Sequence, residues 1–127
     1  MIPLNRCDPI TFVLTADRDR ARAFYAETLG LPVLAEDDFA VTFRLSDGTT
    51  MRLSGVPGYQ PHPHTVLGWA VPDIRATLAD LRAKGISPNI YDGFGQDADG
   101  IWTSPTSDAH VCWFPDPDGN VLSLTQF

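Results

Sequence analysis

The side chains that most often hold metals or transfer protons are scarce in this sequence. Its 127 residues include three histidines, two glutamates and two cysteines, namely His62, His64, His110, Glu27, Glu36, Cys7 and Cys112. A protein metal site needs several nitrogen, oxygen or sulfur ligands that converge on one point. Any such site must therefore combine these few residues with aspartates, for example His62 and His64 with one aspartate. The run His62-Pro63-His64 is also typical of a solvent-exposed linker.

The charge balance limits the class of partner. Sixteen acidic and nine basic residues give a net charge of −7. This argues against nucleic acids and anionic membranes, because both attract basic surfaces. No apolar run approaches a membrane span, and the first residues lack the apolar stretch of a secretory signal. We expect a cytoplasmic protein with reduced thiols, and the eight arginines against the single Lys84 suggest a GC-rich bacterial genome.

Two segments of the chain resemble each other. Asp17 and Asp73 each precede apolar residues at helical spacing, and Gly30 and Gly85 each follow them. Aspartate is a good N-cap because its carboxylate accepts the first free N–H groups of a helix. Glycine commonly ends a helix because it takes the left-handed conformation. The starts are 56 residues apart and the stops 55, so the sequence predicts two helices in a duplicated unit.

Strand patterns surround each predicted helix in the same order. One apolar stretch precedes each helix and three follow it, at about 10–16, 31–35, 39–45 and 49–54 in the first copy and 65–71, 86–91, 110–114 and 121–126 in the second. The breaker-rich run 55–63 separates module one (about 8–54) from module two (about 64–127). The prediction is one α+β domain over residues 1–127, made of two βαβββ modules. A glycine-rich loop at 92–108, which contains Trp102, is either a lid, a packed loop or a surface loop.

These features resemble the vicinal oxygen chelate superfamily, which includes glyoxalase I, bleomycin-resistance proteins and extradiol dioxygenases. The resemblance rests on Phe24-Tyr25 followed by Leu29-Gly30, on Pro72-Asp73 and Lys84-Gly85, and above all on the run Asp116-Pro117-Asp118-Gly119-Asn120. It implies that the two modules form an open, barrel-like mixed sheet around a cavity, with the helices outside. It also implies a homodimer, either side by side or with exchanged modules.

The resemblance also locates the metal ligands of related enzymes. The corresponding positions here are Ile10, Arg52, Val66 and Ser123. Isoleucine and valine have no lone pair, arginine is a permanent cation, and one serine does not hold a divalent ion. We therefore expect no metal and no other cofactor. His64 lies two residues before Val66 and would point to the same face of the strand.

Period-two alternation then sorts residues around the implied cavity. If these positions face it, the candidate ligand-binding residues are Phe12, Arg52, His64, Val66, Trp102 and Ser123. Residues Val13, Met51, Leu53, Leu67, Trp69, Leu122 and Leu124 would pack under the helices, and Cys112 is expected to be a buried strand residue. Arg52 would pair with a protein acid or a ligand carboxylate, phosphate or phenolate, or else reach solvent at the rim. Trp102 and Trp113 would stack on an aromatic ligand or serve as packing.

Three functions fit these observations. The favoured one is a metal-independent small-molecule binding protein, similar to the bleomycin-resistance branch, that sequesters a drug or metabolite. The second is a glyoxalase-like lyase, isomerase or dioxygenase with an unrecognised metal site, and the third is an interaction or regulatory domain without chemistry. No catalytic residue is assigned. The metal-independent binding protein is favoured because the residues at the four implied metal positions cannot hold a metal.

Overall fold

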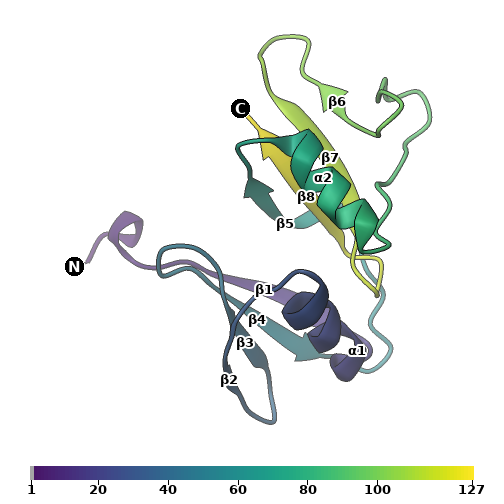
Figure 1. The fold of residues 1–127 in the computed structure, drawn as a ribbon. Coiled ribbons are helices and arrows are strands. Elements are labelled where there is room, and N and C mark those ends of the chain that lie inside the picture. The colour runs from purple at the N-terminus through teal and green to yellow at the C-terminus, as the bar shows by residue number, and fades with distance from the viewer. Residues whose placement is uncertain (1) are drawn as a thin grey trace. The chain divides into compact units, whose positions relative to one another are not determined.

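A computed structural model describes residues 2–127, and the chain divides into two compact units, residues 2–61 and residues 62–127. Both units contain a four-stranded mixed sheet with a helix on one face (Figure 1). No strand of one sheet pairs with a strand of the other within the described residues. The boundary falls inside the predicted linker 55–63. A cavity shared by the two modules stays a prediction.

The first unit follows the predicted order of elements. The elements are η1 (Leu4–Arg6), β1 (Ile10–Thr15), α1 (Arg18–Ala23), a π-helical turn η2 (Phe24–Thr28), β2 (Val33–Glu36), β3 (Val41–Arg44) and β4 (Thr50–Gly55). Their order in the sheet is β1-β4-β3-β2, with β1 parallel to β4 and the other pairs antiparallel. The predicted first helix thus ends in a π turn, in which the Leu29 N–H donates to the Phe24 carbonyl at 2.9 Å.

The second unit repeats this topology. Its elements are β5 (Thr65–Ala70), α2 (Ile74–Ala83), β6 (Trp102–Thr103), β7 (His110–Pro115) and β8 (Val121–Gln126). The sheet order is β5-β8-β7-β6, again with one parallel pair between the first and last strands of the unit. The two units therefore share the βαβββ arrangement that the sequence predicts, and the fold class is α+β.

The predicted helix caps are present in both units. The carboxylate of Asp17 accepts the N–H of Arg20 at 3.2 Å, and Asp73 accepts the N–H of Ala76 at 3.1 Å. Gly30 and Gly85 have φ of +74° and +86°, the left-handed conformation that ends a helix at little cost only for glycine. These four residues fix where the helices begin and end.

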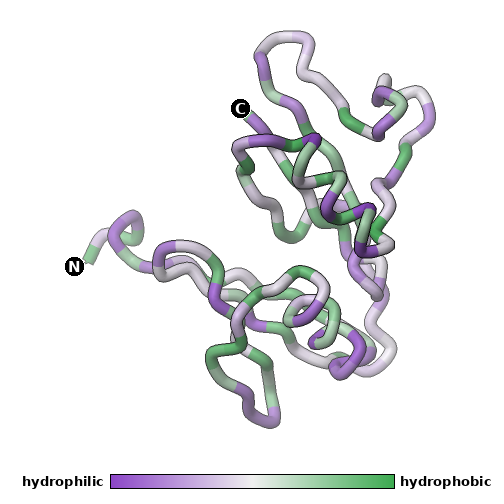
Figure 2. Tube along the Cα trace, in the orientation of Figure 1, coloured by the Kyte–Doolittle hydropathy of each residue, from purple (hydrophilic) through white to green (hydrophobic). Residues whose placement is uncertain are grey.

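Each sheet has a face covered by its helix and an open face. In the first unit Val13, Met51 and Leu53 are buried with Tyr25 and Phe43, and in the second Leu122 and Leu124 are buried with Leu78 and Phe114. On the opposite face of β1, Ile10, Phe12 and Leu14 are 51%, 63% and 37% exposed. The alternation predicted for β1 and β4 is thus confirmed, whereas the first four residues of β8 are buried on both faces. Hydrophilic residues gather in the turn between β2 and β3 (Figure 2).

One predicted strand is wrong. Residues 86–91 form no strand, and β6 comes instead from Trp102–Thr103, inside the segment predicted as a loop. Pro88 has no N–H to give to a sheet, and in this segment the Asn89 N–H donates to the Trp113 carbonyl at 2.7 Å. No helix in residues 2–127 is both long and apolar enough to cross a membrane.

Candidate ligand-binding site

A cavity of about 360 Å³ opens on the second unit. Its lining comes from the start of β5, the segment after α2, β7 and β8, and consists of Pro63, His64, Thr65, Tyr91, Phe94, Trp113 and Val121. No lysine, arginine, aspartate or glutamate is among these residues. An apolar concave surface with a few polar groups is the usual composition of a small-molecule site.

Three aromatic rings give the cavity its shape. The ring of Trp113 lies 5.8 Å from that of Tyr91 and 5.4 Å from that of Phe94, with interplanar angles of 75° and 80°. The rings of Tyr91 and Phe94 are 6.1 Å apart at 67°. The three planes are therefore close to mutually perpendicular. We call Tyr91, Phe94 and Trp113 the aromatic corner.

The sheet register places Trp113 in this corner. Trp113 on β7 pairs with Ser123 on β8, and Ser123 pairs with Gly68 on β5, so all three lie on the same face of the sheet. This is the open face, because Cys112 and Phe114, the neighbours of Trp113, are buried on the opposite side. The Cys112 thiol is desolvated there, and burial raises its pKa to about 11. The prediction that Cys112 is a buried strand residue is confirmed.

Gln96 holds the other two rings in place. Its side-chain carbonyl accepts the N–H of Tyr91 at 2.7 Å, and its amide nitrogen donates to the carbonyls of Asn89 and Gly100 at 2.9 and 2.8 Å. One side chain therefore ties both ends of the segment that carries Tyr91 and Phe94. Such side chain to backbone bonds fix a loop that has no ladder of its own.

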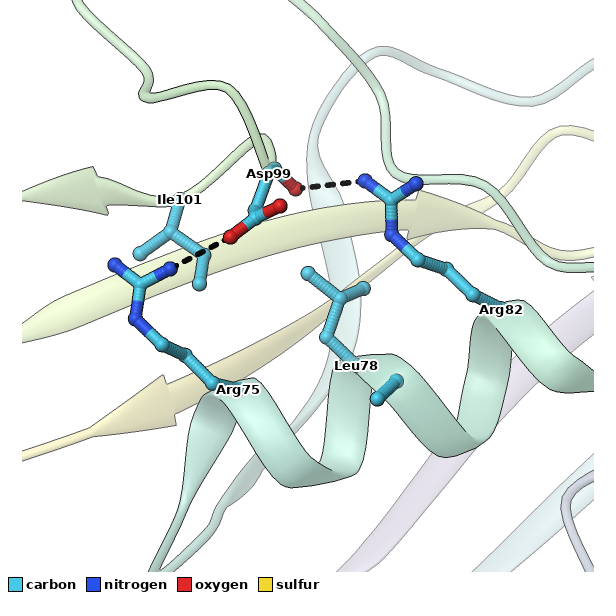
Figure 3. Close-up of a pocket in the computed structure, with 6 residues that line it drawn as sticks. Arg75, Leu78, Arg82, Asp99 and Ile101 are labelled. Atoms are coloured by element: carbon cyan, nitrogen blue, oxygen red, sulfur yellow. Dashed lines mark hydrogen bonds and ion pairs between the residues drawn. The ribbon is translucent and has the colours of Figure 1, made fainter.

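Two arginines of α2 fasten the same loop to the helix (Figure 3). Arg75 contacts the carboxylates of Asp97 and Asp99, each at 2.8 Å, and Arg82 donates to the Asp99 carbonyl at 3.1 Å. The hydrogen bond from Arg75 lowers the pKa of Asp97, and Asp97 in turn accepts the N–H groups of Asp99 and Ile101. Arg75 and Arg82 thus attach the loop to α2, while Tyr91 and Phe94 line the cavity.

The structure brings together only some of the predicted binding residues. His64 lines the cavity, and Trp102 contacts Phe94 and Trp113, with ring centroids 5.9 and 6.5 Å apart. Ser123 is buried beside Trp113, and a Cβ at Gly68 would clash with its hydroxyl. Val66 is not among the lining residues and lies where the β5–β8 register shifts.

Arg52 and Phe12 lie side by side in the first unit and do not line this cavity. They are register partners on β1 and β4, on the open face of that sheet. Arg52 is half-buried and makes no hydrogen bond or ion pair within residues 2–127. The N–H groups of Phe39 and Ala40 lower the pKa of Asp37, and the charge of Arg52 adds to this effect. A role for Arg52 and Phe12 in ligand binding stays a prediction.

Tyr91 and Phe94 are site residues that the sequence did not reveal. Tyr91 is the last residue of the strand predicted at 86–91, and Phe94 lies in the glycine-rich loop. The only sequence feature that could have indicated them is the pair of aromatic residues on either side of Asp92-Gly93. This pair indicates an aromatic cluster only when its contact with Trp113 is known. That partner is about twenty residues away and comes from another strand.

The residues at the implied metal positions do not fit a divalent cation. Ile10 and Val66 offer no donor atom, Arg52 is cationic, and Ser123 supplies one hydroxyl. Within residues 2–127 no three histidine, cysteine, aspartate or glutamate side chains cluster closely enough to hold a metal. The rings of His62 and His64 do stack, with centroids 6.0 Å apart, but no acidic residue joins them in such a cluster.

Comparison with known families agrees with the duplicated fold. The sequence model of the Glyoxalase/Bleomycin resistance protein/Dioxygenase superfamily matches residues 6–124. The chain belongs to this superfamily. The resemblance inferred from the caps and the Asp116–Asn120 turn is thereby confirmed. No curated protein sequence matches closely enough to count as a relative.

Solved structures of other superfamily members and related proteins share the fold. A superfamily member from Sphaerobacter thermophilus has a TM-score of 0.74 at 21% identity, covering 94% of this chain and 96% of its own. An integron cassette protein from the Halifax Harbour sewage outfall metagenome has 0.75 at 19%, covering 96% and 99%. TnmS3, described as an antibiotic binding protein from Streptomyces sp. CB03234, has 0.67 at 24%, covering 92% of each chain. At these identities the likeness establishes the fold alone.

Proposed function

We propose that this superfamily member is a small-molecule binding protein that holds its ligand in the cavity of the second unit without a metal. The observation that carries the proposal is the aromatic corner, three near-perpendicular rings around one cavity. Its volume of about 360 Å³ is in the range of ligand pockets. His64, Thr65 and Tyr91 carry the polar side-chain groups of the lining that would orient a ligand.

The proposed biological role is sequestration of a drug or metabolite. A protein that binds its ligand tightly and leaves it unchanged needs a shaped apolar surface and no reactive group, which matches the lining of this cavity. TnmS3, which shares the fold, is described as an antibiotic binding protein, and this supports the same role here. We further propose that the protein is a cytoplasmic homodimer. Gel filtration coupled to light scattering measures the molar mass and tests the dimer.

Ligand binding is tested with a panel of antibiotics and aromatic compounds. A ligand that binds only the folded protein raises its melting temperature, so thermal shifts find binders and tryptophan fluorescence gives their affinities. Trp113→Leu removes one wall of the corner and is expected to abolish the shift, whereas Phe39→Leu changes an exposed ring of the first unit and leaves it intact. A panel without a binder, or a binder indifferent to Trp113→Leu, refutes the proposal.

Two further measurements separate sequestration from catalysis. Elemental analysis of freshly purified protein is expected to find far less than one zinc, nickel or iron per chain. Mass spectrometry of a bound compound after long incubation is expected to recover it unchanged. Near-stoichiometric metal would refute metal-independent binding. Metal-stimulated conversion of a hemithioacetal or catechol would instead support a lyase, isomerase or dioxygenase.

A further inference from the structure

We infer that the aromatic corner binds an alkylated ammonium group, so that the ligand is an organic cation. This inference rests on the proposed function and names its ligand class. It depends on the geometry of Tyr91, Phe94 and Trp113, on the distribution of charge between the two units, and on the polar groups that the lining lacks.

The first step is the geometry of the rings. The face of an aromatic ring is electronegative and attracts a cation within about 6 Å of the ring centroid. A cation about 4 Å above each of three mutually perpendicular faces requires ring centres separated by about 5.7 Å. The observed separations are 5.4, 5.8 and 6.1 Å at angles of 67° to 80°. These separations and angles match those of three rings around one cationic centre, and they are also those of rings that pack edge to face on one another.

The second step is the charge of the unit that contains the cavity. Residues 62–127 hold eight aspartates and no glutamate against Arg75, Arg82 and Lys84, which gives −5 of the net −7. Residues 1–61 hold eight acids and six arginines and carry the remaining −2. Arg75 and Arg82 are also engaged by the loop on the outer side of α2. The net charge of the unit that contains the cavity thus favours a cation over an anion.

The third step is the form of the cation. A primary ammonium group carries three N–H donors, and burying them without acceptors is costly. The lining has no carboxylate, and its polar side chains are those of His64, Thr65 and Tyr91. A quaternary ammonium group has no donor to satisfy, and a tertiary one has a single donor. An alkylated ammonium therefore fits this lining better than a primary amine.

The test compares a cation with its neutral isostere. Choline and 3,3-dimethyl-1-butanol differ mainly in that a quaternary nitrogen replaces a quaternary carbon. Binding is followed by NMR through the indole N–H signals of the full-length protein. Because cation–π attraction contributes about 1–2 kcal/mol, choline is expected to bind about tenfold more tightly. Equal affinity, tighter binding of the alcohol, or binding of neither probe overturns the inference.

Matched variants test whether the affinity for choline depends on the aromatic rings. Tyr91→Phe keeps the aromatic face and is expected to retain choline affinity, whereas Tyr91→Leu and Phe94→Leu are expected to weaken it about fivefold or more. Both positions are partly exposed, so the variants are expected to fold, and circular dichroism checks this. Phe39→Leu is the control. Loss of affinity in Tyr91→Phe, or none in either leucine variant, refutes the role of the rings.

The two proposals fail in distinguishable ways. If the panel of antibiotics and aromatic compounds yields a Trp113-dependent ligand that is neutral or anionic, and choline shows no preference over its isostere, the cavity binds small molecules but not by cation–π contact. If no compound of either set binds, the proposed function itself is refuted.

Discussion

The turn formed by Asp116-Pro117-Asp118-Gly119-Asn120 is expected to act in folding and not in ligand binding. One carboxylate oxygen of Asp116 accepts the N–H groups of Asp118 and Asn120 at 3.0 and 2.9 Å. The other accepts the side-chain amide of Asn120 at 2.8 Å. Asp116 and Asn120 are only 4% and 1% exposed, so water does not replace these bonds easily.

The expected cost follows from the donors that lose their acceptor. Asp116→Ala removes the carboxylate that accepts from two buried Asn120 donors, at about 1–3 kcal/mol each, while the less buried Asp118 N–H reaches water. We expect the free energy of unfolding to fall by about 3 kcal/mol. Asp116→Asn keeps the oxygen that accepts both N–H groups but turns its amide nitrogen toward that of Asn120. It is expected to cost about 1–2 kcal/mol.

Urea unfolding followed by tryptophan fluorescence measures this cost in the right unit, because all three tryptophans, Trp69, Trp102 and Trp113, lie in residues 62–127. Asp80→Ala, an exposed position on α2, is the control and is expected to change the free energy of unfolding by less than about 0.5 kcal/mol. The reasoning is refuted if Asp116→Ala behaves like Asp80→Ala, or if Asp116→Asn is as costly as Asp116→Ala.

Three further predictions concern the loop and the thiols. Arg75→Met removes both ion pairs of the loop; because these pairs are exposed, the free energy of unfolding should change little, while amide exchange in residues 97–101 accelerates. The pKa of Asp97 is lowered by Arg75, so the stabilisation from this pair is present above the ordinary pKa of 3.8 and is lost as the pH falls through the lower value of the folded protein. An NMR titration of Asp97 checks this, and an unshifted pKa would contradict it. At pH 8 a thiol reagent should modify the exposed Cys7 and not Cys112, whose pKa is about 11, and should modify both in urea; two reactive thiols in the native protein would contradict this.

The duplicated scaffold could be predicted because its signals are local. Asp17 and Asp73 cap helices through backbone groups three residues away, and Gly30 and Gly85 end them through their own φ angles. The turn between the antiparallel strands β3 and β4 is also local, because Asp47 and Gly48 form it with φ of +47° and +80°. Each of these residues specifies structure within one turn of the chain, so a single sequence is enough to recognise them.

The failures come from contacts that sequence patterns do not encode. Residues 86–91 have the composition of a strand, but Pro88 and the bonds of Gln96 hold them as an irregular segment. Alternation correctly places Arg52 and Phe12 on the open face of their sheet. It does not indicate that the cavity described in the second unit is lined by Tyr91 and Phe94 instead.

The scaffold and the binding site therefore depend on different residues. The caps and turns that identify the superfamily, Asp17, Gly30, Asp73, Gly85 and Asp116, lie outside the cavity lining. Two of the three rings come from a loop that Gln96, Arg75 and Arg82 attach to one helix. The loop is held by α2 and by the short pairing of β6 with β7, so a different loop on these contacts would change the ligand without changing the order of the strands. The chemistry of the ligand is thus to be sought in residues 91–101, and the superfamily match by itself does not specify it.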